Sequence, residues 1–250
     1  KGVAHLFKKH KVTHLEGRGR LQGGGKVEVE AEDGSKESYS ARHVILATGS
    51  RPRDIPVLPI DEARVWSSTG ALFQTETPES LAVVGAGAVG MEFADVFNAY
   101  GTKVTVIEAL DRILPLEDKD SSSTVQRSFK KRGMDFHTGA RVEAAEVGEN
   151  SVLLTFKDSK GESQTLAVQH VLSAVGRVPN TADLGLEAAG VQLDERGFFA
   201  VDEFMRTNAA GVYALGDCSG RQLLAHKAMH EGVICVEAIA GVGHGSVDYN

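Results

Sequence analysis

The sequence predicts an α/β fold of two similar lobes, each a doubly wound parallel sheet, with one lobe inserted into the other. Three observations carry this prediction: a strand–helix–strand unit near the middle, a repeated hairpin pattern around it, and a composition of 42% hydrophobic and 24% charged residues. The net charge of −7 comes without a basic block, which argues against a nucleic-acid-binding protein. No apolar stretch approaches the roughly 20 residues that cross a bilayer, so no membrane association is expected.

The central unit alternates strands and helices. Leu81–Gly85 is a short apolar strand, and residues 88–100 follow with apolar side chains at helical spacing. Lys103–Glu108 predicts the second strand. A helix near 118–132 starts with acidic and ends with basic residues, and a strand at 134–137 completes the pattern typical of a doubly wound sheet.

A hairpin followed by an apolar strand occurs twice. The first copy has alternating residues from Lys26, a turn at Asp33-Gly34, and the strand 43–49; the second has residues 151–157, a turn, and the strand 170–176. Each apolar strand ends at a glycine. This repetition predicts two related lobes, although two unrelated hairpins remain an alternative.

The repeat also predicts the domain limits. Residues 73–195 form one complete domain, and residues 1–72 and 196–250 form parts of a second domain split around it. Gly85 precedes His170 by 85 residues, so the matching glycine turn for His43 would fall before residue 1. We therefore expect the chain to begin inside a domain.

Gly85-Ala-Gly87-Ala-Val-Gly90 follows a strand and opens a helix, which is typical of a dinucleotide-binding turn. Gly85 would permit the tight turn, Gly87 would let a diphosphate approach the backbone, and Gly90 would allow close packing of helix on strand. Glu108 ends the second strand, where a carboxylate accepts the ribose hydroxyls of NAD and repels the extra phosphate of NADP. An ordinary glycine-rich turn with a surface glutamate is the alternative.

Three further positions are candidates for ligand binding. Glu92 is predicted in the first turn of the helix, either as a favourable acid there or near the nicotinamide. Asp217 follows the strand Val212–Leu215 and a glycine, so its carboxylate suits a chain of hydroxyls, although it equally suits a turn. His226 lies at the start of a helix expected at residues 225–240.

The chain has two cysteines, Cys218 and Cys235, which excludes a disulfide framework and a Cys-x-x-Cys metal site. No catalytic and no metal-ligating residue is predicted.

These segments together resemble the flavoprotein disulfide reductases, also called pyridine nucleotide-disulfide oxidoreductases, and among them most closely the dihydrolipoamide dehydrogenases. The resemblance covers essentially the whole chain. It rests on Gly17-Arg-Gly19, Ala47-Thr-Gly-Ser50, Gly85 to Glu92, Gly176-Arg-Val-Pro-Asn180 and Gly211 to Cys218, and more softly on Ala4-His-Leu-Phe-Lys-Lys and Leu224-Ala-His226-Lys-Ala.

The resemblance implies two Rossmann-like domains of three-layer ββα organisation, an NAD domain inserted into a truncated FAD domain. It implies the following FAD-binding residues: Gly19, Thr48, Gly49, Ser50, Asp217, Leu223, Leu224, Ala225 and His226. It implies the following NAD-binding residues: Gly85, Ala86, Gly87, Ala88, Val89, Gly90, Met91, Glu92, Glu108, Val142 and Gly176.

The sequence also departs from that family. The redox cysteine pair, spaced with four residues between, the first glycine motif for FAD, and the C-terminal His-Glu pair are all missing from these 250 residues. The two cysteines lie 17 positions apart and form no such pair.

The resemblance implies oxidation of protein-bound dihydrolipoyl groups with reduction of NAD, by the full-length parent enzyme. Its partners would be the dihydrolipoyl-bearing acyltransferase of a 2-oxoacid dehydrogenase complex and a second copy in a homodimer. The location would be the cytoplasm, or the mitochondrial matrix in a eukaryote. The alternatives are a related reductase, such as mercuric reductase or soluble transhydrogenase, and a nucleotide-binding fragment without turnover.

Overall fold

The computed structural model describes residues 2–243 and 245–249, which form two compact units. The split unit comprises the residues up to Arg51 and from Val178 onward, and the inserted unit comprises Pro52–Arg177. The inserted unit therefore interrupts the split unit along the chain. Both boundaries lie earlier in the chain than the predicted limits after residues 72 and 195.

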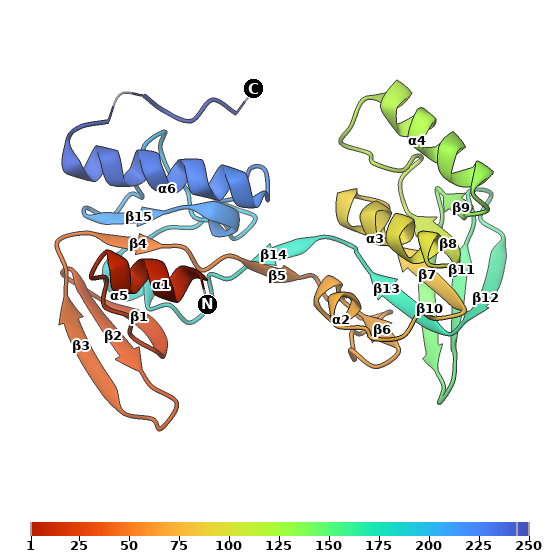
Figure 1. The fold of residues 1–250 in the computed structure, drawn as a ribbon, viewed down its shortest axis with the longest axis horizontal. Helices are drawn as coiled ribbons and strands as arrows, with labels where there is room; N and C mark the ends of the chain where they lie inside the picture. Colours follow the sequence, from red (N-terminus) through yellow and green to blue (C-terminus); the bar gives the residue numbers. More distant parts are fainter. Residues whose placement is uncertain (1, 244, 250) are drawn as a thin grey trace. The chain divides into compact units, whose positions relative to one another are not determined.

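The inserted unit contains the predicted alternation of strands and helices (Figure 1). Its elements are β7 (Ser80–Val84), α3 (Ala88–Ala99), β8 (Lys103–Glu108), α4 (Lys119–Lys131) and β9 (Asp135–Thr138). Asp118 caps α4 by accepting hydrogen bonds from two backbone N–H groups of its first turn. Periodicity and end signals therefore predicted this part of the fold within one or two residues.

Two short elements explain why the inserted unit begins earlier than predicted. Strand β6 (Val65–Trp66) pairs in parallel with β13 (His170–Ser173) at one edge of a five-stranded sheet of order β6-β13-β7-β8-β9. Helix α2 (Ser68–Leu72) packs against these two strands. Residues 52–72 thus supply the edge strand of this sheet and a helix that packs against it.

The inserted unit has three layers (Figure 1). Helices α3 and α4 cover one face of the parallel sheet, and β10 (Arg141–Val147), β11 (Val152–Lys157) and β12 (Ser163–Val168) cover the other as an antiparallel sheet. One buried cluster, including Met91 and Phe97, fills the helix side, and another, including Val142 and Phe156, fills the space between the sheets. This is the three-layer ββα organisation that the family resemblance implied.

The split unit repeats the antiparallel part of this plan. Strands β1 (Arg18–Gly23), β2 (Lys26–Glu30) and β3 (Lys36–Ser40) form a three-stranded sheet, and β4 (Val44–Leu46) follows, as β13 follows β12. Strand β4 pairs in parallel with β15 (Val212–Ala214). Ile45 remains 38% exposed, so β4 is less covered than its apolar sequence predicted.

The remaining elements of the split unit are short, except for the long helix α6 (Ala225–Ala240). Helix α5 (Leu186–Ala189) packs on β1, which is why the split unit resumes earlier than predicted. Strands β5 (Ser50–Pro52) and β14 (Arg177–Pro179) pair where the chain passes between units, and a 3-10 turn, η1 (Gly216–Ser219), follows β15.

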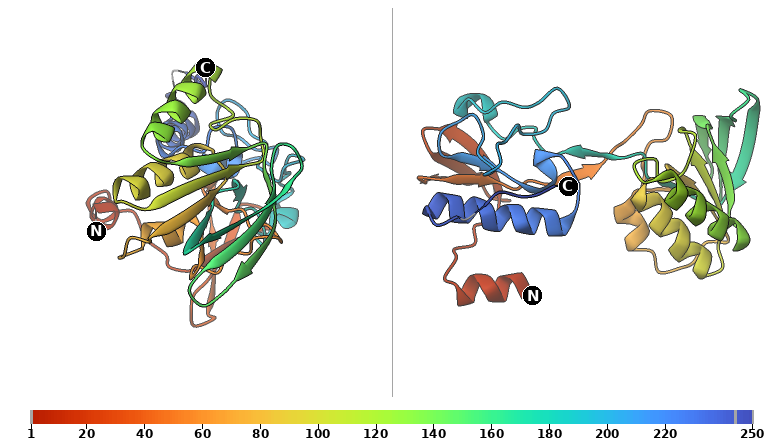
Figure 2. Two further views of the ribbon diagram at one scale, coloured as in Figure 1. Left: turned by 90° about the vertical axis from the view of Figure 1, so that its right-hand side faces the viewer. Right: turned by 90° about the horizontal axis from the view of Figure 1, so that it is seen from above.

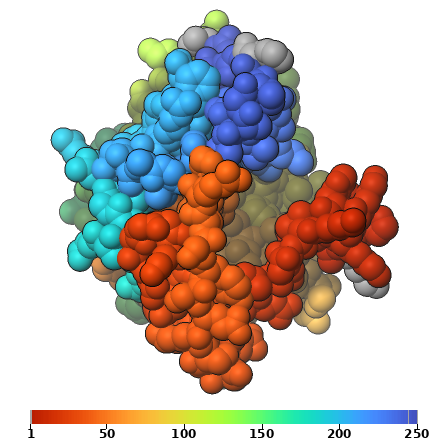
Figure 3. Space-filling view, turned by 90° about the vertical axis from the view of Figure 1, so that its left-hand side faces the viewer, coloured from red at the N-terminus to blue at the C-terminus, as the bar shows by residue number. Residues whose placement is uncertain are grey.

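Helix α1 (Gly2–Lys9) has no buried residue. It stands apart from the rest of the split unit in Figure 2 (right) and projects from its surface in Figure 3 (dark red). Among the described residues, no helix is both long and apolar enough to cross a membrane.

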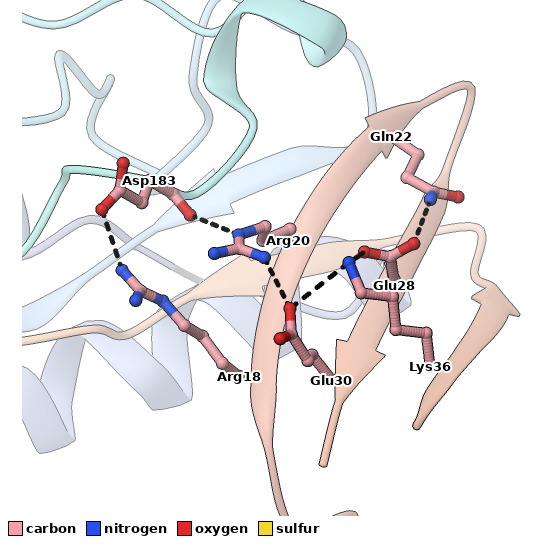
Figure 4. Close-up of polar contacts among 7 residues, drawn as sticks. All are labelled: Arg18, Arg20, Gln22, Glu28, Glu30, Lys36 and Asp183. Atoms are coloured by element: carbon pink, nitrogen blue, oxygen red, sulfur yellow. Dashed lines mark hydrogen bonds and ion pairs between the residues drawn. The ribbon is translucent and has the colours of Figure 1, made fainter. Parts of the chain in front are cut away.

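Charged side chains on the face of the β1–β2–β3 sheet pair with one another (Figure 4). Arg20 Nη1 lies 2.7 Å from Glu30 Oε2, and Lys36 Nζ lies 3.2 Å from Glu28 Oε1 and 3.4 Å from Glu30 Oε2. Arg18 pairs with Asp183 at 3.2 Å. The positive charges of Arg18, Arg20 and Lys36 are thereby balanced by neighbouring carboxylates.

His170 lies half-buried beside the single tryptophan. Its ring stacks on Trp66 with 4.1 Å between centroids, and its Nε2 lies 3.1 Å from Nη1 of Arg64. Burial and the nearby guanidinium lower the pKa of His170. Its Nδ1 is buried without a hydrogen-bond partner in the structure.

Candidate functional site

A cleft of about 610 Å³ lies in the inserted unit at the carboxyl ends of β7, β8 and β13. Ligands of open α/β sheets bind at this end of the strands. Five residues that the sequence singled out come together in its wall: Gly85, Gly87, Glu108, Val142 and Gly176.

The three glycines of the turn after β7 and the first turn of α3 meet different steric conditions. Gly85 has φ +99°, and a Cβ there would lie 2.4 Å from the carbonyl oxygen of Ala174. At Gly90 a Cβ would lie 2.0 Å from the carbonyl oxygen of Gly85. At Gly87, the N-cap of α3, a Cβ would meet nothing within 4 Å. Gly85 and Gly90 are therefore required by the fold, whereas Gly87 leaves open space at the helix N-terminus.

Glu108 is buried, with 7% of its surface exposed, yet its carboxylate borders the cleft. Oε2 accepts a hydrogen bond from the backbone N–H of Ala86 at 2.6 Å, and Oε1 accepts one from Leu110 at 2.8 Å. The carboxylate therefore also fixes the glycine turn to the end of β8. Each oxygen retains a further lone pair with which it can accept a hydrogen bond from a ligand hydroxyl.

The segment after β8 forms one rim of the cleft. Leu114 has φ +45° and donates its N–H to the carbonyl oxygen of Ala86 at 2.7 Å. The carbonyl of Leu110 accepts from the N–H of Gly139 at 2.7 Å. Leu110 and Pro115 thereby line the cleft from a loop that is tied to the glycine turn.

The remaining predicted residues of this region do not line the cleft. Ala86 and Met91 are buried in the core, and Ala88 and Val89 are exposed on α3. The prediction that Glu92 lies in the first turn of α3 was wrong: the helix begins at Ala88, so Glu92 starts the second turn and is exposed outside the cleft.

Sequence reasoning missed most of the apolar wall of the cleft. These residues lie at or just after the ends of β7, β8 and β13, at the start of β10, or in a loop before β6. Position at the end of an apolar strand was the one available signal. The missed lining residues are Ile55, Val57, Val84, Ile107, Ala109, Leu110, Pro115, Ala140, Arg141, Ala174 and Val175.

In the split unit, the end of β4 meets the turn after β15. Ser50 Oγ donates to Asp217 Oδ2 at 2.6 Å, although the two residues are 167 positions apart. Thr48 Oγ1 donates to the carbonyl of Asn180 at 2.6 Å, and Asn180 donates to the carbonyl oxygens of Thr48 and Gly49, each at 3.0 Å. Four predicted residues from two distant segments are thus neighbours.

The other predicted residues of the split unit lie at the surface. Leu224 is the extended N-cap of α6, and Ala225 and His226 are its exposed first residues, with Leu223 half-buried before them. Gly19 is exposed in β1, where it pairs with Val29 of β2. No group of three or more His, Cys, Asp and Glu side chains within the described part of the chain is arranged to hold a metal ion.

Comparison with known proteins defines the class. The family model of the pyridine nucleotide-disulphide oxidoreductases matches residues 1–232, so the chain belongs to this family. It is 42% identical over 251 aligned residues to dihydrolipoyl dehydrogenase 3 of Pseudomonas putida, covering 100% of this chain and 53% of that protein.

Solved structures agree with this assignment. LpdA from Mycobacterium tuberculosis superposes with a TM-score of 0.90 at 33% identity, over 99% of this chain and 54% of that one. The HOCl-induced flavoprotein disulfide reductase RclA from Escherichia coli gives a TM-score of 0.86 at 28% identity, over 98% and 55%. The chain therefore spans about half the length of the relatives it matches.

The family implies FAD and NAD(P) as cofactors, and the residues present fit them. The open space at Gly87 admits a diphosphate at a helix N-terminus, and Glu108 borders the same cleft. Asp217 presents its carboxylate after a left-handed glycine, Gly216, at φ +78°. Such an acceptor suits the hydroxyl groups of a flavin side chain.

Proposed function

We propose that this chain supplies the FAD-binding and NAD-binding residues of a dihydrolipoyl dehydrogenase, which oxidises protein-bound dihydrolipoyl groups and reduces NAD. The observation that carries the proposal is the cleft in which Gly87 and Glu108 lie together beside Gly176. The 42% identity with a dihydrolipoyl dehydrogenase supports the choice within the family.

The residues of the cleft would bind and orient the dinucleotide. Backbone N–H groups at the start of α3 would bind the diphosphate, and the Glu108 carboxylate would accept from the ribose hydroxyls. Val142 and the apolar wall would exclude water from the adenine end. When bound, FAD accepts the two electrons of a dithiol, and NAD carries them away as hydride.

Asp217 would hold the ribityl chain of FAD, with Ser50 fixing the direction of its carboxylate through the 2.6 Å hydrogen bond. Thr48, Gly49, Gly19 and residues 223–226 would complete the flavin site. In this proposal the residues of both sites bind and orient the two cofactors, and Glu92 lies on the side of the nicotinamide.

Neither cysteine of the described chain is suited to exchange with a dithiol. Cys218 and Cys235 are both fully buried, and burial raises the pKa of the Cys235 thiol. Cys218 donates its thiol hydrogen to the carbonyl oxygens of Leu46 and Leu215. We therefore propose that these 250 residues alone bind nucleotides and do not oxidise dihydrolipoamide.

The proposed partners follow from the proposed reaction. They are a dihydrolipoyl-bearing acyltransferase of a 2-oxoacid dehydrogenase complex and a second copy of the protein in a homodimer. The proposed location is the bacterial cytoplasm or, in a eukaryote, the mitochondrial matrix.

The test is a titration of the purified chain with NADH and separately with NADPH, followed by calorimetry. Saturable binding with preference for NADH is expected, together with no turnover of dihydrolipoamide. The protein expressed from its complete gene is then mixed with dihydrolipoamide in a stopped-flow spectrometer, where loss of the oxidised flavin band is expected. No NADH binding, or flavin reduction by a different dithiol and not by dihydrolipoamide, contradicts the proposal.

A further inference from the structure

Helix α6 carries a buried pair of opposite charges that the proposed function does not use. Nζ of Lys227 lies 3.2 Å from Oε2 of Glu231, one turn apart, and their side chains are 3% and 0% exposed. A buried ion pair is costly unless its remaining hydrogen-bonding groups find partners. The groups to which Lys227 and Glu231 form their other hydrogen bonds therefore indicate the structural role of the pair.

The pair holds both ends of the turn that presents Asp217. Glu231 Oε2 accepts the backbone N–H of Gly216 at 2.7 Å, and Lys227 donates to the carbonyl oxygens of Gly216 and Gly220, each at 3.0 Å. Both glycines have a positive φ, +78° and +76°, which side chains with a Cβ rarely adopt. The peptide groups around Asp217 are thereby fixed by two buried charges, while Ser50 fixes its carboxylate.

The final described segment joins the same network. Tyr249 donates its hydroxyl to Oε1 of Glu231 at 2.8 Å, and its ring lies 4.0 Å below the guanidinium of Arg221. Burial and the hydrogen bond to Glu231 raise the pKa of Tyr249 to about 12, so the hydroxyl stays a donor at neutral pH. Val247 packs against the cluster of Met205, Tyr213 and Cys235.

We propose that Lys227, Glu231 and Tyr249 are positioning residues for the flavin: they hold the Gly216–Gly220 turn so that Asp217 faces the ribityl chain. Tyr249 acts on Asp217 through Glu231, which couples residues 245–249 to the flavin site. This inference rests on the proposed function, because the ligand it concerns is FAD.

The sequence signal for these residues is weak but real. Lys227, Glu231 and Cys235 lie four residues apart on one stripe of α6, and all three are buried. A Lys and a Glu at this spacing normally form a surface pair. Cys235 is apolar and therefore expected on the buried face of the helix. Counting back from it by four residues reaches Glu231 and then Lys227, so helical spacing alone would have predicted that both charges are buried.

The experiment compares variants of the protein expressed from its complete gene. Tyr249→Phe removes one hydroxyl and leaves the ring beneath Arg221, and Glu231→Gln keeps size but leaves the Lys227 charge unpaired. Glu237→Gln, on the same helix, is the matched control, since the Glu237 side chain is only half-buried, and the hydrogen bonds from α6 side chains to the turn come from Lys227 and Glu231. Each protein is stripped of flavin and titrated with FAD, and its saturated visible spectrum and NADH affinity are recorded.

Loss of one hydrogen bond predicts about three- to tenfold weaker FAD binding for Tyr249→Phe, and the unpaired charge predicts at least about tenfold for Glu231→Gln. The flavin bands should shift in both variants and stay unchanged in Glu237→Gln, while NADH affinity stays unchanged in all three.

Wild-type FAD affinity and an unshifted spectrum in Tyr249→Phe overturn the inference, even if Glu231→Gln fails to fold. In that case FAD binding by the wild-type protein leaves the proposed function standing. Failure of the wild-type protein itself to bind FAD overturns both.

Discussion

Gly87 and Gly90 lie three residues apart in the same turn, yet the structure predicts opposite effects of adding one methyl group to each. At Gly90 the new Cβ would lie 2.0 Å from the carbonyl oxygen of Gly85 and 3.2 Å from Cγ1 of Val83. A carbon–oxygen contact needs about 3.3 Å, so α3 would have to move about 1.3 Å. At Gly87 the space is open and φ is −72°, so alanine fits without strain.

The magnitudes follow from these distances. Moving α3 disturbs its packing through Met91 and Phe97, and overpacking of this kind costs about 1–3 kcal/mol. For a unit of this size about 4 °C of melting temperature corresponds to 1 kcal/mol, so Gly90→Ala should lower the melting temperature by about 4–12 °C. Gly87→Ala should lower the free energy of unfolding by no more than about 1 kcal/mol, because alanine is a poorer N-cap residue than glycine. It should weaken NADH binding at least about tenfold, because its methyl group enters the cleft.

The assay uses the single tryptophan as a local reporter. Trp66 is 1% exposed in the core of the inserted unit, so its fluorescence on heating follows the unfolding of that unit. NADH affinity is measured by calorimetry on the same samples. A wild-type melting temperature for Gly90→Ala, or wild-type NADH affinity for Gly87→Ala, would refute the roles assigned to these glycines.

Three further predictions concern single side chains. Glu108→Arg should weaken NADH and strengthen NADPH binding in calorimetry, at the cost of two backbone hydrogen bonds; unchanged preference would mean that Glu108 does not contact the ribose. Ser173→Ala should stabilise the inserted unit against urea by about 1 kcal/mol, because the buried Ser173 hydroxyl has no partner; a loss would reveal a partner for it. Burial lowers the pKa of His170, so below about pH 6.5 the unfolded chain binds a proton at this histidine more readily than the folded chain does. The free energy of unfolding is therefore unaffected by His170 above about pH 6.5 and decreases as the pH falls below it. His170→Gln should flatten this decline in a melting series from pH 7.5 to 5.5, and an equally steep series would contradict it.

The sequence predicted best those elements in which periodicity and end signals agree. Strand β8 and helix α6 match their predicted bounds, and α4 is capped by Asp118 as its acidic start indicated. Strands β1 and β10 were not predicted, because their sequences contain too few apolar residues to show the alternation typical of a strand. Strand β1 is Arg-Gly-Arg-Leu-Gln-Gly, with one buried side chain. An edge strand of a half-solvated sheet gives a weak hydrophobic signal.

The residues of the candidate site likewise fall into those that the sequence could predict and those that it could not. Gly85, Gly87 and Glu108 were predictable because a turn, a close approach and a carboxylate at a strand end each require particular residue types. The apolar wall was not predictable, since Ile55 or Val175 in a loop resembles any other apolar residue until the chain is folded. Glu231 was missed because its charge suggested the surface, whereas the bonds that make its burial tolerable come from Gly216, fifteen residues earlier.

The internal repeat explains why equivalent glycines end the two apolar strands while their surroundings differ. Gly49 follows β4 at φ +71° and Gly176 follows β13 at φ +109°, each six residues after its histidine. In the inserted unit β13 lies between β6 and β7, so Gly176 adjoins the glycine turn and lines the cleft. In the split unit β4 pairs with β15, so Gly49 adjoins Ser50 and Asp217 instead. The repeat therefore places a glycine with positive φ at the same point of both units. The strand that pairs beside it determines which residues adjoin that glycine, and hence which part of a ligand it can contact.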